Sequence, residues 1–401
     1  MTFPYSPSRM LCASAFVVAF SGFTVPALAL DADDFATKLA AISSQSGTSL
    51  SFSAVEPDGS TIVLKSVRVQ APGQAPFNAG DITFYGVEEV NDGSYHADQA
   101  LFEDIQIVDG PTKVSITGIQ MSNLKIPPVK QVYDPADNIG FFQSISTGQI
   151  NFEHEGDKVF SLGGTKVNLD SGDDGNRVDI KMSGSDLWID LDRLDDAKAR
   201  QGLAELGYQT LTGDISVDGM WQMDTGILNV TEMFSLDDVG SLSLSMQVSG
   251  YTRELVEAMQ QAQKAAAENP DKKAAEQALG LSMLGLMQQL SFNSAAIRFE
   301  DASVTERALA FAGKQQGVSG DQMRMALKGM LPLMLGQIGI PELQKQIAAA
   351  ANVYLDNPQN ITITAKPESP VALPVIMGAG MGDPKSLVDL LNVEVSANTS
   401  D

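Results

Sequence analysis

Apolar and polar residues alternate along much of the first two-thirds of the chain, and this pattern predicts β-strands. The clearest stretch is residues 212–250, TGDISVDGMWQMDTGILNVTEMFSLDDVGSLSLSMQVSG. Turn sequences at 224–226 and 238–240 divide it into three strands, and such short connections make neighbouring strands antiparallel. The third strand has an apolar face and a mainly serine face: Leu242, Leu244, Met246 and Val248 against Ser241, Ser243, Ser245, Gln247 and Ser249. The serine face is expected to meet water.

Strands are also predicted between residues 48 and 126, where the alternation is less regular. In KVSITGIQMSNLKI, residues 113–126, the apolar positions share one face only in part. We therefore predict that the regular strand around Leu244 covers a dry core. The irregular strands between Asp81 and Ile126 are expected to line a groove.

A helical period of about 3.6 residues appears near the start of the chain and again after Tyr251. Residues 31–43, DADDFATKLAAIS, place Phe35, Leu39 and Ile42 on one helical face. The later helices and strands are predicted at these places: helices near 254–268, 271–290, 303–316, 320–338 and 341–356, and strands at 291–301, 360–367 and 391–398. Ser303 and Glu306 match a capping box, in which the two side chains bond the first free N–H groups of a helix.

These patterns predict an α+β protein. An extended antiparallel sheet, a meander in the N-terminal two-thirds, is expected to pack with C-terminal helices. We divide the chain into a signal peptide at 1–29, a β-rich region at 30–250 and a helical region with interleaved strands at 251–401. No long linker separates the last two regions, so they are expected to pack on each other.

The first 29 residues have the pattern of a cleaved secretory signal peptide. Arg9 precedes a short apolar stretch, and the small residues Ala27 and Ala29 follow it. The stretch is shorter than the about 20 residues that a membrane-spanning helix needs. We expect cleavage after Ala29 and no transmembrane helix in the mature chain.

Cysteine content and charge restrict the location and the partners. Cys12, the only cysteine, lies inside the signal peptide, so the mature chain is expected to form no disulfide. Export without disulfides favours a periplasmic location. The chain carries 26 basic and 50 acidic residues, a formal net charge of −24. This charge disfavours nucleic-acid binding, which needs basic residues against the phosphates, and it disfavours attachment to anionic lipid surfaces.

Residues 371–386, VALPVIMGAGMGDPKS, superficially match a phosphate-binding loop. That motif needs two glycines whose backbone N–H groups help to cradle the phosphates. Ala379 and Pro384 occupy the two glycine positions here, and proline has no N–H to donate. We instead expect a tight loop before a helix, with Asp383 as the N-cap and Pro384 at the first helical position.

Other matches to catalytic or metal-binding patterns are weak. Ser122 and Lys125 match the serine-lysine pattern of acyl-transfer enzymes, which needs both residues on one helical turn. A strand at this place is expected to send them to opposite faces. His96 and His154 are expected to be strand or surface residues. We therefore predict no catalytic, cofactor-binding or metal-binding residue, and no cofactor.

Two further features have alternative interpretations. Aspartates cluster in two places: Asp170, Asp173, Asp174 and Asp179, and then Asp190, Asp192, Asp195 and Asp196. Neither cluster has the spacing of a calcium loop, so solvated turns are expected. Methionine- and leucine-rich stripes at 283–290 and 323–338 are predicted to form core under the sheet. An acyl-chain pocket or a partner groove is the alternative, because methionine adapts to irregular apolar partners.

Two stretches resemble uncharacterised exported envelope proteins of proteobacteria. They are residues 205–250, which contain Trp221 and the two turns named above, and residues 297–317 together with 360–371. More loosely, the repeated amphipathic strands are similar to AsmA-like envelope proteins, in which a sheet curls around a lipid-accommodating groove. The helical C-terminal third departs from that pattern. The resemblance implies an envelope protein and no particular activity.

These observations lead us to expect a non-enzymatic periplasmic envelope protein that binds or handles a hydrophobic ligand such as lipid. The alternative is a structural or interaction protein of the cell envelope that docks a protein partner through sheet edges or the methionine-rich helices. A hydrolase is a third hypothesis, because aspartates and serines are plentiful.

Overall fold

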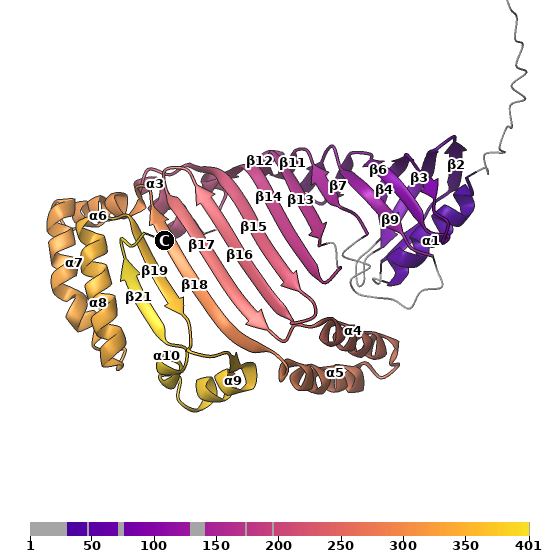
Figure 1. The fold of residues 1–401 in the computed structure, drawn as a ribbon. Coiled ribbons are helices and arrows are strands. Elements are labelled where there is room, and N and C mark those ends of the chain that lie inside the picture. Colours follow the sequence, from indigo (N-terminus) through magenta and orange to yellow (C-terminus); the bar gives the residue numbers. More distant parts are fainter. Residues whose placement is uncertain are drawn as a thin grey trace, which may run out of the picture.

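The computed structural model describes residues 30–45, 48–70, 76–128, 141–172, 175–194 and 196–400. The expected signal peptide, with Cys12, lies outside the described residues. One antiparallel sheet of many strands runs along the molecule, and most of the helices are in the C-terminal part of the chain (Figure 1). The predicted α+β class with a strand meander is confirmed.

The main path of the sheet follows the chain from an N-terminal edge to a C-terminal edge. In spatial order its strands are β3 (Thr61–Gln70), β4 (Phe77–Tyr85), β6 (Tyr95–Phe102), β9 (Gln120–Ile126), β10 (Ser144–Thr147), β13 (Gly164–Ser171), β14 (Arg177–Asp190), β15 (Thr210–Gln222), β16 (Ile227–Leu236), β17 (Gly240–Ser249), β18 (Ser291–Asp301), β19 (Asn360–Ala365) and β21 (Val393–Ala397). Each pairing is antiparallel, so a residue on one strand and its partner on the next share a face.

Shorter strands join this path at its sides. At the N-terminal edge, β1 (Ser49–Ser51) and β2 (Ala54–Asp58) both pair with β3. A branch of four strands leads to β14: β7 (Ile105–Asp109), β8 (Thr112–Ile116), β11 (Ile150–His154) and β12 (Asp157–Leu162). Two-residue strands in the described part of the chain also join the sheet: β5 (Glu88–Glu89), which pairs with β6, and β20 (Val371–Ala372), which pairs with β18.

The three strands predicted within 212–250 are β15, β16 and β17, and the turns lie where expected. Gly240 ends the second turn with φ of 147°, a conformation that side chains rarely adopt. A Cβ at this position would lie 2.2 Å from the carbonyl oxygen of Glu300 on β18. Glycine is therefore required here, both by the backbone conformation and by the close approach of β18.

The predicted helices are present. Their bounds are α1 (Ala32–Gln45), α4 (Arg253–Glu268), α5 (Lys272–Met287), α6 (Val304–Gln315), α7 (Gly320–Leu335) and α8 (Pro341–Asp356). Within the described residues, short helices accompany them: η1 (Leu191–Arg193), α3 (Ala197–Glu205), α9 (Leu373–Gly382) and α10 (Ser386–Leu390).

The capping box predicted at Ser303 is wrong, although α6 does begin next to it. The Ser303 side chain makes no cap hydrogen bond and instead donates to the carbonyl oxygen of Asp238 in the β16–β17 turn. The Thr305 N–H donates a hydrogen bond to the carboxylate of Asp301, at 3.0 Å. A tertiary contact therefore replaces the local one that the sequence pattern suggested.

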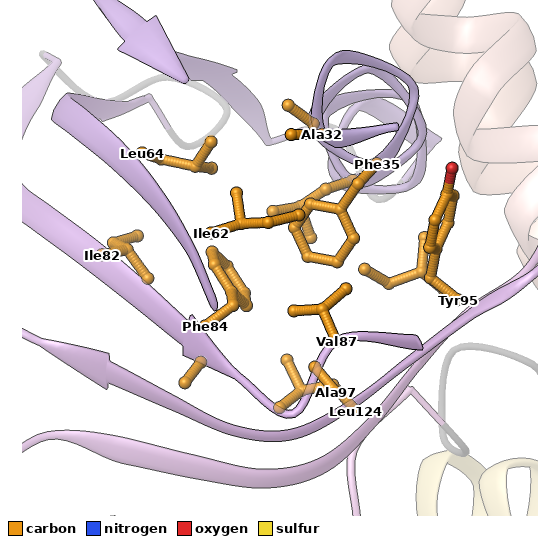
Figure 2. Close-up of a cluster of buried hydrophobic side chains, with 14 of the residues drawn as sticks. Ala32, Phe35, Ile62, Leu64, Ile82, Phe84, Val87, Tyr95, Ala97 and Leu124 are labelled. Atoms are coloured by element: carbon orange, nitrogen blue, oxygen red, sulfur yellow. The ribbon is translucent and has the colours of Figure 1, made fainter. Parts of the chain in front are cut away.

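The best-buried core lies under α1, at the N-terminal end of the sheet (Figure 2). Phe35 of α1 is fully buried and packs edge-on against Phe84 of β4 and Tyr95 of β6, with ring centroids 5.0 and 5.5 Å apart. Leu124 and Ile126 of β9 are buried in the same cluster. The expectation of a groove between Asp81 and Ile126 is wrong for β4, β6 and β9, because α1 covers these strands and their apolar side chains form a dry core. Ile107 and Val108 of β7, in the same range, are exposed and lie outside this core.

The C-terminal edge of the sheet is covered by a helix. Helix α8 lies beside β21, and the Val395 N–H of that edge strand donates to the side-chain oxygen of Gln346, at 3.0 Å. Tyr354 of α8 donates to the carboxylate of Asp301 at 3.0 Å, and burial raises the pKa of this tyrosine to about 12. These contacts cover an edge strand whose backbone N–H and C=O groups would otherwise be free to pair with another strand.

The methionine- and leucine-rich helices are not core under the sheet, contrary to the sequence-based expectation. Helices α6, α7 and α8 lie beyond β21, and α4, α5, α9 and α10 lie at one set of strand ends (Figure 1). On α7, Met323 is buried, but Met325, Met330, Leu333 and Met334 are exposed. The sheet therefore keeps much of its own apolar face uncovered.

Candidate functional site: an uncovered apolar face of the sheet

A single row of directly opposite residues crosses the sheet from β3 to β21 on one face. Its members are Ile62, Phe84, Ala100, Met121, Ile145, Val167, Met182, Val217, Glu232, Leu244, Ile297, Ile363 and Val395. All but Glu232 are apolar. The face that forms the dry core under α1 is thus the same face that continues, strand by strand, to the C-terminal edge.

Two parallel rows widen this face from β14 onward. One contains Ile180, Gly219, Val230, Met246, Ala295, Ala365 and Val393, and the other contains Gly184, Ile215, Phe234, Leu242, Phe299, Ile361 and Ala397. We call the three rows between β14 and β21 the apolar face. It is an area with no charged side chain except that of Glu232.

Large side chains of the apolar face are exposed. The exposed fractions are 46% for Met182, 49% for Met246, 48% for Ile297 and 44% for Ile363. Leu244 is partly buried, so the dry core predicted beneath it is wrong. Soluble monomers rarely expose contiguous apolar patches larger than a few hundred Å², and larger patches mark interaction sites.

Helix α4 closes one end of the apolar face. Val256 of α4 packs against a small buried cluster of Val178, Trp221 and Met223. The Trp221 indole N–H donates to the carbonyl oxygen of Tyr251, at 2.6 Å, just before the helix begins. The packing of α4 therefore marks where the uncovered region ends at this set of strand ends.

The opposite strand ends are tied together around Tyr208. Its hydroxyl donates to the carbonyl oxygen of Asp238 at 3.0 Å, and the Arg307 guanidinium stacks 4.6 Å from the ring centroid. Arg307 belongs to α6, so this contact joins that helix to the β16–β17 turn. The strands that carry the apolar face are thus held at both ends.

The other face of the sheet is polar. The serines of β17 lie there, together with Arg298 and Glu300 of β18, whose side chains are 3.0 Å apart. Farther along, the hydroxyls of Ser122 and Ser144 are 2.6 Å apart across β9 and β10. From β14 to β21 the apolar side chains thus gather on one face, with the exposed Met233 as an exception on the polar face.

Glu232 stands alone in the centre of the apolar face. Val217 and Leu244 lie directly opposite it on the neighbouring strands. Val230 and Phe234 flank it on β16, because residues two apart on a strand share a face. Among the described residues, no hydrogen bond or ion pair of its carboxylate is found, and the side chain is partly buried.

The segment that superficially matched a phosphate-binding loop is mainly helical. Residues 373–382 form α9, so Gly378, Gly380 and Gly382 lie in a helix rather than in a loop. Asp383 is the C-cap residue of α9, and α10 begins only at Ser386. The expected Asp383 N-cap with Pro384 at the first helical position is therefore wrong, and the reason is that the apolar run LPVIM continues into the glycines as one helix.

Ser122 and Lys125 also differ from expectation. Asn123 between them has φ of 53° and interrupts the alternation of β9. Met121 and Leu124 consequently both pack in the core, which leaves Ser122 and Lys125 on the same outer face. Both belong to a strand rather than to one helical turn, and the Ser122 hydroxyl bonds to Ser144.

The histidines and aspartates have structural contacts. His96 Nε2 lies 2.6 Å from the Asn123 side-chain oxygen, and His154 Nδ1 lies 3.2 Å from the Thr112 hydroxyl. Asp190 caps η1 and Asp196 caps α3, while Asp173, Asp174 and Asp195 lie outside the described residues. Within the described ranges, no group of three or more histidine, cysteine or acidic residues is placed to hold a metal ion.

Sequence inspection missed the apolar face as a site and missed Glu232. The alternation of β15, β16 and β17 was visible, but it does not tell whether a helix covers the apolar side. The sequence does contain one signal for this site, which is the position of Glu232 along its strand. Aligning the strands about their turns places it in the apolar register, as the only acidic residue at such a position in 212–236.

Comparisons with other proteins add little about chemistry. A family model described as "Uncharacterized protein" matches residues 233–398, from within β16 to just beyond β21, and no curated protein matches the chain. The match covers much of the apolar face and all of the helices from α4 onward. In the described part of the chain, no helix is long and apolar enough to cross a membrane.

Proposed function

We propose that this chain is a non-enzymatic periplasmic envelope protein that binds a hydrophobic ligand, such as a lipid acyl chain, on its apolar face. The observation that carries the proposal is the row of apolar side chains, interrupted by Glu232, which is buried under α1 and partly or largely exposed from β14 to β21. The N-terminal signal-peptide pattern supports export, and the resemblance to AsmA-like proteins agrees with a lipid-binding sheet.

The size of the apolar face suits long chains. Strands β14 to β21 make six successive pairings. At about 4.8 Å per pairing they span roughly 29 Å. The hydrocarbon core of a bilayer is about 30 Å thick and holds two acyl chains end to end. One lipid chain lying across the strands therefore fits with room to spare.

The energetics favour apolar ligands over polar ones. Each buried CH₂ group contributes about 0.8 kcal/mol, and the side chains of Met182, Met246, Ile297 and Ile363 are all exposed and available. Methionine side chains adapt to irregular apolar shapes. A face of this kind therefore discriminates little among chains of similar length.

Ile297→Glu tests the proposal directly. Ile297 lies in the central row and is half exposed, so a glutamate there is solvated in the free protein but is desolvated when an acyl chain covers it. We expect Ile297→Glu to weaken binding of a fluorescent fatty-acyl probe about tenfold or more, because burying an unpaired charge is costly.

Ala296→Glu is the matched control. It adds the same charge one residue away on β18, but on the polar face, opposite Ser245 and Thr364. We expect this variant to bind the probe like the wild type. Equal weakening by both variants, or unchanged binding by Ile297→Glu, would contradict binding on the apolar face.

The second candidate function is docking of a protein partner by the C-terminal helices. Exposed apolar side chains on α7 and α9, among them Leu333, Met334 and Met381, favour it. Those side chains are separate from the apolar face, and the Ile297 and Ala296 variants do not change them. Acyl-probe binding that is unchanged by Ile297→Glu but is weakened by substitutions on α7 would show that these helices, and not the apolar face, form the exposed binding surface.

A further inference from the structure

We propose that Glu232 selects ligands that carry an ammonium group beside the apolar chain and rejects those that carry a carboxylate. The inference rests on the proposed function, since it assigns a head-group preference to the same face. Glu232 is the one charged side chain in the three rows from β14 to β21.

The surroundings of Glu232 show why its charge matters only when a ligand is bound. Its cross-strand neighbours Val217 and Leu244 are apolar, and so are Val230 and Phe234 on its own strand. In the free protein, water reaches the partly buried carboxylate. A ligand that covers the apolar face removes this water, and a desolvated carboxylate is costly unless a cation or a hydrogen-bond donor replaces it.

An ammonium group meets that requirement best. It offers up to three N–H donors and a positive charge, and charge-assisted hydrogen bonds are roughly twice as strong as neutral ones. A hydroxyl offers one donor and no charge, and a fatty-acid carboxylate adds repulsion. The side chain of Glu232 therefore ranks single-chain amphiphiles in the order amine, alcohol, acid.

The position of Glu232 also fixes where the head group lies. It is on the middle row, with three strands (β17, β18 and β19) between it and β21. A ligand whose amine contacts Glu232 can extend its chain over Leu244, Ile297 and Ile363 toward the C-terminal edge. The apolar side chains on that path are among the most exposed of the face.

The test compares three probes with the same ten-carbon chain: decylamine, decanol and decanoic acid. Binding to the full mature protein is measured by calorimetry below the micelle concentration, at about pH 7.5, where the amine is protonated and the acid is ionised. We expect the wild type to bind the amine at least about tenfold more tightly than the acid, as a hydrogen bond to a charged group implies. In Glu232→Gln this ratio falls by about tenfold, and decanol binding changes little.

Asp218→Asn is the matched control, because it removes one negative charge from the same part of the sheet. Asp218 lies on β15 next to Val217 but on the polar face, opposite Thr231. If the net charge of the molecule alone favoured amines, both variants would lower the ratio equally, and that result overturns the inference. An unaltered ratio in Glu232→Gln overturns it as well.

The outcomes also separate this inference from the proposed function. Equal binding of all three probes by the wild type overturns the role of Glu232 and leaves the apolar face as a binding site. Failure of all three probes to bind overturns both. Thermal unfolding of Glu232→Gln serves as the check that this nearly isosteric change leaves the fold intact.

Discussion

Phe35 and Leu244 show how one sheet face has two different roles. Phe35 of α1 packs onto the same apolar side of the sheet that carries Leu244, but Phe35 is fully buried between α1 and the strands, while Leu244 is only partly buried. Burial by protein makes the first residue a determinant of stability. Incomplete burial leaves the second available to a ligand.

Alanine substitutions are expected to separate these roles. Phe35→Ala leaves a cavity in a dry core and is expected to cost about 3–5 kcal/mol of unfolding free energy. Leu244→Ala removes partly solvated surface and is expected to cost about 1 kcal/mol. Urea unfolding measures both, with Ser245→Ala on the polar face as a control near zero. A cost for Leu244→Ala as large as that for Phe35→Ala would mean that a dry core lies over β17 after all.

At the scale of elements, the packing of α1 on the sheet determines which strands form the buried core. This helix is held to the sheet by Asp34, which accepts a hydrogen bond from Tyr95 of β6 at 2.8 Å and pairs with Lys38. The hydrogen bond from Lys38 and then that from Tyr95 lower the pKa of the Asp34 carboxyl below its ordinary value of 3.8, against the opposing effect of burial.

This lowered pKa predicts an acid-dependent contribution to stability. A carboxyl whose pKa is lower in the folded state stabilises the fold above its unfolded pKa, and the contribution is lost as the pH falls through the folded value. The wild type is therefore expected to unfold at higher urea than Asp34→Asn at neutral pH, with the difference shrinking below the ordinary value of 3.8. Asp33→Asn, an exposed neighbour on α1, is the control. A difference that stays constant down to the lowest pH would show that Asp34 does not hold α1 through its charge.

Element types could be predicted from the sequence more fully than their packing. Alternation located β15, β16 and β17, and the period of 3.6 located α4 to α8, because both signals are local. The core under α1 could not be located, since Phe35 packs against Phe84 and Tyr95, which lie far from it along the chain. Ser303 failed as a cap for the same reason, because its hydroxyl bonds to a distant turn.

The candidate site was predictable only in part. The amphipathic strands predict a hydrophobic ligand, but the groove predicted between Asp81 and Ile126 is wrong for β4, β6 and β9, which α1 covers. The uncovered part lies from β14 to β21 because the C-terminal helices pack at the edge and the strand ends of the sheet (Figure 1). No local pattern reports where a helix will pack.

At the scale of the whole molecule, one antiparallel sheet joins a buried core to an uncovered apolar face, which we propose as a binding surface. Residues under α1 keep the N-terminal end dry, and α8 covers the last strand at the other end. Between them the same apolar row continues with exposed methionine and isoleucine side chains. The molecule thus presents a long apolar surface on a sheet whose C-terminal edge strand is covered.

Photo-crosslinking with a diazirine-bearing fatty amine, followed by mass mapping of the adducts, tests this account most directly. We predict adducts on the exposed members of the apolar face, above all Met182, Met246, Ile297 and Ile363, with few on the serines of β17. Competition by unlabelled decylamine is expected to remove them. Adducts confined to exposed side chains of α7 and α9, or spread equally over both faces of the sheet, would contradict the account.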